Sequence, residues 1–177
     1  YENNIQKRFG GWCMTDMAAG MRVGTGWDLH RLEEGRNLVV GGVSIPSPKG
    51  SVAHSDGDAL IHSIIDAMLG AAGMDDIGTL FPDTDPSYCG ADSAELLSQV
   101  VKAVASRGFH VCNLDTTVVL QSPKLGPYKA AIRERLASLI GVEPSCVGVK
   151  AKTAEGILGE LGTGSAIMAQ AVVLLGL

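Results

Sequence analysis

"DALIHSIIDAMLG", residues 58–70, is the segment around which the other predicted elements are arranged. Its apolar side chains recur three and four positions apart, which is the spacing of one face of an α-helix. Asp56 or Asp58 can cap the start of this helix, because aspartate is a preferred N-cap residue. We therefore expect an amphipathic helix that carries two polar side chains, His62 and Asp66. The apolar positions are Leu60, Ile61, Ile64, Ile65, Met68 and Leu69.

Strands and helices are predicted to interleave around this helix. β-branched and apolar residues predict strands, whereas helical spacing predicts helices. We expect strands within 37–46, broken at Gly41 and Gly42, and over 110–121, 145–153 and 165–177. We expect helices from Ser93, a plausible N-cap, to about Arg107 and over 127–141, and loops over 46–55 and 74–93. This order of elements predicts an α+β fold, with a β-sheet that carries helices packed on one face.

The composition predicts one domain. The chain has 177 residues, of which 46% are hydrophobic and 19% charged, so it can bury a full core. Residues 1–20 lack periodicity, and we interpret them as a tail, a vector-derived remnant or the end of a processed leader. The domain is expected to span 21–177. No apolar run reaches the roughly 20 residues that span a bilayer, so we expect a soluble protein without membrane partners.

The charge and the cysteines exclude other classes. A net charge of −5 argues against a general nucleic-acid binder, because such proteins normally present a basic face. The four cysteines are widely spaced, so neither a zinc ribbon nor a disulfide framework is indicated, and free thiols in a reducing compartment are expected.

A candidate metal site begins in "GTGWDLH", residues 24–30, where a strand is expected to end. Residues two apart on an extended backbone point the same way, so Asp28 and His30 can reach one point. His62 on the predicted helix is a third donor. Nitrogen and oxygen ligands with a fourth position open match a catalytic zinc site rather than a structural one. On the residues alone, a surface turn and a hydrogen-bonded core histidine remain alternatives.

Other polar residues have two interpretations each. His54 could be a fourth ligand, a proton shuttle or a solvated side chain. Asp58 could simply cap its helix, although a helix start is also an anion site. Lys124 and Lys152 could be ordinary surface lysines.

Six segments together resemble one enzyme family: "DLH", "AHSDGD", "DALIH", "DIGTLFPDTDP", "QSPK" and "KAKTAE". In this order they are similar to the 2-C-methyl-D-erythritol 2,4-cyclodiphosphate synthases, over about residues 21–177. The resemblance implies the nonmevalonate route to isoprenoid precursors. It implies cyclisation of 4-diphosphocytidyl-2-C-methyl-D-erythritol 2-phosphate with release of CMP, by a homotrimer with active sites between subunits. It also implies a cytoplasmic enzyme in a bacterium, or one of the plastid stroma or apicoplast in a plastid-bearing eukaryote.

The resemblance also implies roles for individual residues. Zinc would be held by Asp28, His30 and His62, with Asp58 as a supporting carboxylate that fixes the tautomer of a ligating imidazole. Glu155 would help to hold a second metal ion, Mg²⁺ or Mn²⁺, through the phosphates. The residues implied in catalysis are His54, Asp58, Thr153 and Glu155.

Two groups of substrate-binding residues are implied, one from each of two neighbouring subunits. The first group is Ser55, Asp76, Ile77, Gly78, Phe81, Asp83 and Asp85. The second group, around the nucleotide, is Pro123, Lys124, Leu125, Ala151, Lys152 and Thr153. The chain departs from the family pattern at Thr25, where many members have histidine, and in "GELGTGSAI", which lacks an arginine near the trimer axis. The missing arginine puts a ligand in the central cavity in doubt.

The implied reaction needs no protein nucleophile, because a phosphate of the substrate attacks its own diphosphate. Positioning and charge neutralisation would supply the catalysis. Two alternatives stay open: a zinc-dependent phosphohydrolase that activates water, and a non-enzymatic trimer that binds a nucleotide or a metal.

Overall fold

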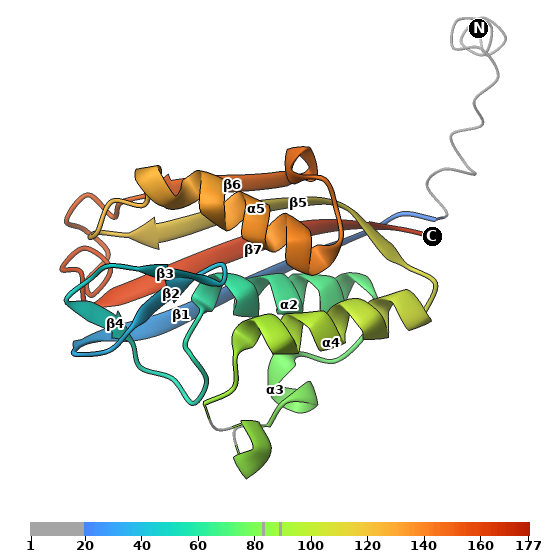
Figure 1. Cartoon of the computed structure of the whole chain (residues 1–177), viewed down its shortest axis with the longest axis horizontal. Coiled ribbons are helices and arrows are strands. Elements are labelled where there is room, and N and C mark those ends of the chain that lie inside the picture. The colour runs from blue at the N-terminus through green and yellow to red at the C-terminus, as the bar shows by residue number, and fades with distance from the viewer. Residues whose placement is uncertain (1–19, 83, 89) are drawn as a thin grey trace, which may run out of the picture.

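The computed structural model describes residues 20–177 except 83 and 89. Asp83, Cys13, Cys89 and nearly all of the expected tail therefore lie outside the described residues. Figure 1 shows a sheet with its long helices on one face. The strands are β1 (Arg22–Glu34), β2 (Leu38–Val40), β3 (Val43–Ile45), β4 (Lys49–Ser51), β5 (His110–Leu120), β6 (Val147–Lys152) and β7 (Ala166–Gly176). The α-helices are α2 (Ala59–Ala71), α3 (Ile77–Leu80), α4 (Ser93–Ser106) and α5 (Lys129–Ile140).

The main sheet has five strands in the order β4-β1-β7-β5-β6. Only β5 and β6 run parallel; the other neighbours are antiparallel. β2 and β3 form a separate hairpin, whose turn holds Gly41 and Gly42, as the sequence predicts. The predicted α+β layering of helices against a sheet is thus confirmed.

The start of the main sheet differs from the prediction. β1 does not end at Asp28 and His30 but continues to Glu34, paired along its length with β7. Asp28 lies opposite Ala169 and His30 opposite Ile167. The expected strand end was wrong because the length of β1 depends on its pairing with β7. β7 lies near the other end of the chain, so the local sequence around Asp28 carries no sign of it. The two side chains still point the same way, as residues two apart on a strand must.

The two predicted loops are more regular than expected. Residues 46–55 contain β4, an edge strand that pairs with the end of β1. Residues 74–93 contain α3 and a 3₁₀ turn, Pro86–Tyr88. α4 is capped by Asp92 rather than Ser93: the Asp92 carboxylate accepts a hydrogen bond from the Ala94 N–H at 2.8 Å.

α2 lies unusually close to β1, because two glycines leave room for its backbone. A β-carbon on Gly24 would lie 1.9 Å from the Ala67 carbonyl oxygen, and one on Gly26 would lie 2.2 Å from that of Ser63. Ten of the thirteen α2 residues are buried. The helix that carries His62 is therefore held at a fixed distance from the strand that carries Asp28 and His30.

The opposite face of the sheet is open within one chain. Val23, Trp27 and Leu29 of β1 are 69%, 63% and 48% exposed, and Val172 of β7 is 40% exposed. The apolar pattern of β7 predicts cover on both sides, but a single chain covers only the side that faces the helices. Among the described residues, no helix has the length and apolar character needed to cross a membrane.

Candidate metal centre

Asp28, His30 and His62 bring three ligand atoms together between β1 and α2. Asp28 Oδ2 lies 3.0 Å from His30 Nε2 and 2.9 Å from His62 Nδ1, and the two ring nitrogens are 3.2 Å apart. The side chains are 25%, 17% and 12% exposed, in that order. The expected set of three therefore converges on one point at the edge of the core, and these residues could hold a divalent metal ion.

The electrostatics of the three residues are coupled. Burial alone would raise the pKa of Asp28, but hydrogen bonds and charge from His30 and His62 outweigh it and hold the pKa well below its ordinary value. Burial lowers the pKa of His62, but the hydrogen bond and charge of Asp28 raise it above its ordinary value. The Asp28 carboxylate thus favours the protonated, positively charged form of His62. A bound metal cation would supply positive charge at the same place.

Two hydroxyl groups lie behind His62: that of Ser55, which was expected at the site, and that of Ser93, which was not. His62 Nε2 is 2.9 Å from Ser93 Oγ and 3.2 Å from Ser55 Oγ. Ser93 is the first residue of α4 and is fully buried. Sequence reasoning interpreted Ser93 as a cap only, because a separation of 31 residues leaves no periodic signal that links it to His62.

Asp58 does not play the expected supporting role toward an imidazole. Its carboxylate is fully buried and accepts hydrogen bonds from the backbone N–H groups of Gly41, Gly42, Leu60 and Ile61. Burial raises its pKa, against the effect of these donors. The prediction that Asp58 fixes a histidine tautomer was therefore wrong, since both of its oxygens face backbone donors. Asp58 instead caps α2 and ties it to the β2–β3 turn.

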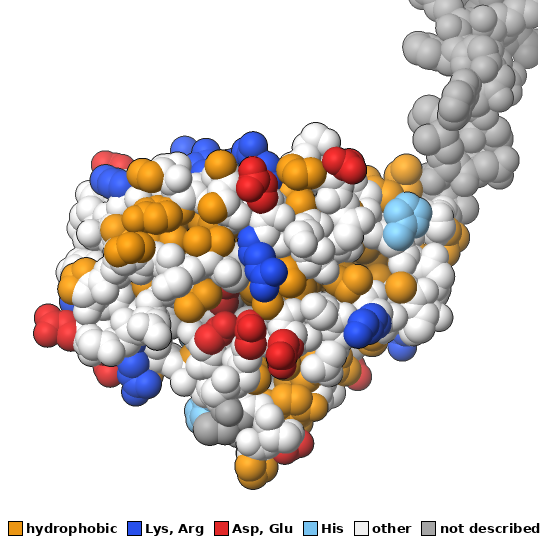
Figure 2. Space-filling view, in the orientation of Figure 1, with side chains coloured by type: hydrophobic (Ala, Val, Ile, Leu, Met, Phe, Trp, Pro, Cys, Tyr) orange, Lys and Arg blue, Asp and Glu red, His pale blue; other side chains and the backbone are white. Residues whose placement is uncertain are grey.

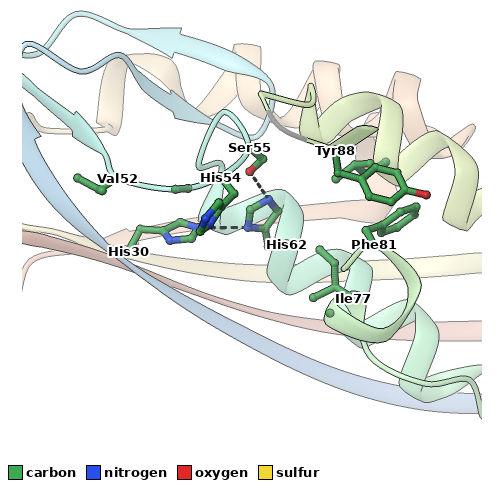
Figure 3. A pocket seen from close by; sticks show the side chains of 11 residues that line it. His30, Val52, His54, Ser55, His62, Ile77, Phe81 and Tyr88 are labelled. Atoms are coloured by element: carbon green, nitrogen blue, oxygen red, sulfur yellow. Dashed lines mark hydrogen bonds between the residues drawn. The ribbon is translucent and has the colours of Figure 1, made fainter. Parts of the chain in front are cut away.

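A cavity of about 310 Å³ opens beside the two histidines. Figure 3 shows the His30 and His62 rings, which meet edge to face, on one side of the cavity, and Phe81 and Tyr88 on the other. The rings of Phe81 and Tyr88 meet edge to face, with centroids 5.3 Å apart. Tyr88 and Leu96 were not predicted to line the site. The remaining lining residues are Val52, Ala53, His54, Ser55, Ile77 and Gly78.

The first group of expected substrate residues surrounds this cavity in part. Ser55, Ile77, Gly78 and Phe81 line it, as does the expected catalytic His54. Asp76 caps α3 through the Thr79 N–H, and Asp85 accepts hydrogen bonds from Ser87; both carboxyl groups are exposed. In Figure 2, acidic side chains gather near the start of α4, where Asp92 and Glu95 are exposed.

The second expected group lies elsewhere in the chain. Residues 123–125 follow β5, and residues 151–155 close β6 and begin the loop after it. None of these residues lines the cavity beside His30 and His62. The Thr153 hydroxyl donates a hydrogen bond to the exposed Glu155 carboxylate. Lys124 and Lys152 are also exposed.

The fold and the site define a class: an α+β domain with a two-histidine, one-carboxylate centre beside a small cavity. Comparison with known proteins narrows this class. The model of the YgbB family matches residues 21–176. A 2-C-methyl-D-erythritol 2,4-cyclodiphosphate synthase of Laribacter hongkongensis is 54% identical over 155 residues, covering 88% of this chain and 95% of that protein. A chloroplastic 2-C-methyl-D-erythritol 2,4-cyclodiphosphate synthase of Oryza sativa is 49% identical over 158 residues, covering 89% of this chain and 71% of that protein.

A solved structure gives the same result. A 2C-methyl-D-erythritol-2,4-cyclodiphosphate synthase in a CDP-bound form matches with a TM-score of 0.81 and 44% identity, covering 87% of this chain and 99% of that one. The chain therefore belongs to the YgbB family, the family of these cyclodiphosphate synthases. The resemblance found in the sequence is confirmed.

Proposed function

We propose that the chain converts 4-diphosphocytidyl-2-C-methyl-D-erythritol 2-phosphate into 2-C-methyl-D-erythritol 2,4-cyclodiphosphate and CMP. The observation that carries this proposal is the convergence of Asp28, His30 and His62 beside a cavity, in a chain that belongs to this family. The relative in a CDP-bound form supports a cytidine nucleotide as part of the ligand.

The donor set fits zinc. Ligands about 2.0–2.1 Å from a tetrahedral Zn²⁺ lie about 3.3 Å from one another, and the three atoms here are 2.9 to 3.2 Å apart. A small outward movement of each side chain would therefore admit the ion. Asp28, His30 and His62 would hold it beside the cavity. When bound, zinc would polarise a phosphate oxygen as a Lewis acid.

The protein groups would position the reacting phosphates. An oxygen of the 2-phosphate attacks the β-phosphorus, the bond from that phosphorus to the bridging oxygen breaks, and CMP leaves with that oxygen. His54 and Ser55, which line the cavity, would contact the phosphates, and Ile77 and Gly78 would contact the methylerythritol part. Effective molarity from such positioning can supply several kcal/mol of the barrier.

The remaining residues would come from a neighbouring copy of the chain. Residues 123–125 and Ala151, Lys152 and Thr153 would surround the nucleotide, and Glu155 would help to hold Mg²⁺ or Mn²⁺. Two observations support a homotrimer with shared sites. These residues lie outside the cavity of their own chain, and the open sheet face carries apolar side chains, which marks interaction surfaces.

Phosphorus NMR of the protein incubated with substrate, Zn²⁺ and Mg²⁺ tests the proposal. We expect a cyclic diphosphate and CMP in equal amounts. Linear phosphates without a cyclic product would indicate a phosphohydrolase instead. Unchanged substrate that still binds would indicate a non-enzymatic binding protein. The matched control is the same mixture with the metals removed by a chelator, which is expected to give no product.

A further inference from the structure

A row of hydrogen bonds runs from the back of the His62 ring to the loop before α2. His62 Nε2 is 2.9 Å from Ser93 Oγ. The Ser93 hydroxyl donates to Asp56 Oδ1 at 2.5 Å, and the Ser93 backbone N–H donates to Asp56 Oδ2 at 3.1 Å. The three residues come from α2, the start of α4 and the loop between β4 and α2, so the row joins three parts of the fold.

The number of protons in this row fixes the role of each atom. Asp56 faces three donors, because the Asp58 N–H also points at Oδ1, at 3.2 Å. A carboxylate with only donors around it is an acceptor. The single hydroxyl proton of Ser93 is therefore used toward Asp56, and only lone pairs of Oγ face His62. It follows that His62 Nε2 carries a proton and donates it to Ser93.

This assignment leaves the other ring nitrogen for the metal. With the proton on Nε2, the lone pair of a neutral His62 is on Nδ1, which is the atom 2.9 Å from Asp28 Oδ2 and 3.2 Å from His30 Nε2. Ser55 Oγ, 3.2 Å from Nε2, lies on the same side as Ser93. The hydroxyl groups and the prospective metal thus lie on opposite edges of the ring.

The row is also well anchored. Ser93 is fully buried. The Asp56 N–H donates to the Ala91 carbonyl at 3.1 Å, and the Gly90 N–H donates to the His54 carbonyl at 2.6 Å. Backbone bonds therefore hold the loop that carries Asp56 against the residues that precede α4. The side chains that contact His62 Nε2 are thus carried by segments that main-chain hydrogen bonds hold together.

We propose that Ser93 and Asp56 are positioning residues that hold His62 in the Nε2–H tautomer and present Nδ1 to zinc. The inference rests on the proposed function, since it takes zinc as the ion at this centre. It assigns to the Asp56–Ser93 pair the task that sequence reasoning gave to Asp58. Outer partners of metal-bound histidines commonly fix the tautomer in this way, and their loss typically weakens metal binding 10–100-fold.

Nitrogen-15 NMR of the zinc-loaded wild-type protein, labelled at histidine, tests the tautomer without any substitution. We expect His62 to show a zinc-bound Nδ1 and a protonated Nε2, whose hydrogen exchanges slowly with water. Zinc bound through Nε2, with the proton on Nδ1, would overturn the inference.

A substitution tests the hydroxyl. In Ser93→Ala, we expect zinc affinity, measured by competition with a chromophoric chelator, to fall 10–100-fold. The matched control is Ser98→Ala on the same helix, where a hydroxyl that donates to the Ala94 carbonyl is lost away from the centre. Ser98→Ala is expected to keep wild-type zinc affinity.

Asp56→Asn tests the carboxylate at nearly constant volume. In either orientation, the amide nitrogen of asparagine would face one of the donors that Asp56 now accepts, which disturbs the direction of the row. We expect a zinc affinity at least as weak as that of Ser93→Ala. Because the two residues act as one unit, the double variant should be no weaker than the weaker single variant.

The outcomes separate this inference from the proposed function. If the wild-type chain takes up no zinc, both fall together. If the wild type binds zinc and the zinc affinities of Ser93→Ala and Asp56→Asn lie within a factor of two of the wild-type affinity, only the inference is contradicted. Zinc affinity and tautomer do not depend on turnover, so an inactive but zinc-loaded protein would contradict the proposed reaction alone.

Discussion

Two regions of the molecule differ in how much of a binding site one chain provides. The first is the centre at Asp28, His30 and His62, and the second is the pair of segments at residues 123–125 and 151–155. The centre is assembled by one chain, from a strand and a helix that two glycines hold in close contact. In the two segments the charged side chains, Lys124, Lys152 and Glu155, are exposed, and neither segment reaches the cavity of its own chain. One chain thus assembles the candidate metal centre by itself, whereas under the proposed function the residues around the nucleotide would come from a second chain.

The largest expected effect comes from removing a ligand of the centre. His62→Ala should remove most of the zinc, which we expect at about one ion per chain in the wild type. Elemental analysis of purified protein measures this. His110→Ala is the matched control, since His110 is exposed at the start of β5 and does not line the cavity. Full zinc content in His62→Ala would contradict the assignment of the centre.

The next effect should separate metal binding from assembly. Trp27 is 63% exposed on the face of β1 that points away from the helices. Trp27→Glu should keep the fold and the zinc, but it should give the mass of one chain rather than three in light scattering and lose activity. Ala105→Glu adds the same charge on an exposed position of α4 and should behave as wild type. A fully active monomer would refute the shared site.

A smaller effect is expected at the nucleotide segment. Lys124→Ala should weaken CDP binding by about 1.5–3 kcal/mol, because it removes one charge-assisted contact to a phosphate. Zinc content should not change, in contrast to His62→Ala. Calorimetry with CDP measures the loss, and Lys102→Ala, on exposed α4, is the control. An unchanged CDP affinity would place Lys124 outside the pocket.

The smallest effect concerns the stability of the part of the fold around α2, the helix that carries His62 and Asp66, and it depends on pH. Asp66 accepts a hydrogen bond from the Ile77 N–H at 2.9 Å. Burial raises the pKa of Asp66 above its ordinary 3.8, although that hydrogen bond opposes the change. A carboxyl group with a raised folded-state pKa stabilises the protein below the unfolded pKa, and this contribution is lost as pH rises through the folded pKa.

Asp66→Asn should therefore raise the melting temperature at pH 7 and have no such benefit near pH 3.8. The gain should be below about 1 kcal/mol, because the group is half exposed and solvent screens its charge. Asp76→Asn should act in the opposite direction, since hydrogen bonds from Thr79 lower the pKa of Asp76. Equal changes in melting temperature for Asp66→Asn and Asp76→Asn at both pH values would contradict the opposite pKa directions assigned to these two residues.

The sequence predicted the parts of the fold that local periodicity encodes. The helix expected over 58–70 is α2, at Ala59–Ala71, and the ligand set follows from it and from the two-residue spacing on β1. The length of β1 was not predictable, because β7 supplies its hydrogen bonds from the other end of the chain. The link from His62 to Ser93 was missed for the same reason. Contacts between distant segments carry no pattern in either segment alone.

β1 uses its two faces for two different purposes. Gly24, Gly26, Asp28 and His30 face α2, whereas Val23, Trp27 and Leu29 face outward. One residue inserted ahead of Gly24 would exchange the two sets along the strand. It would carry Asp28 and His30 to the outer face and put Thr25 in the place of Gly26, where a β-carbon meets the backbone of α2. The length of this segment is therefore constrained as well as its glycines and ligands, because the gain of a single codon ahead of Gly24 would move Asp28 and His30 off the centre.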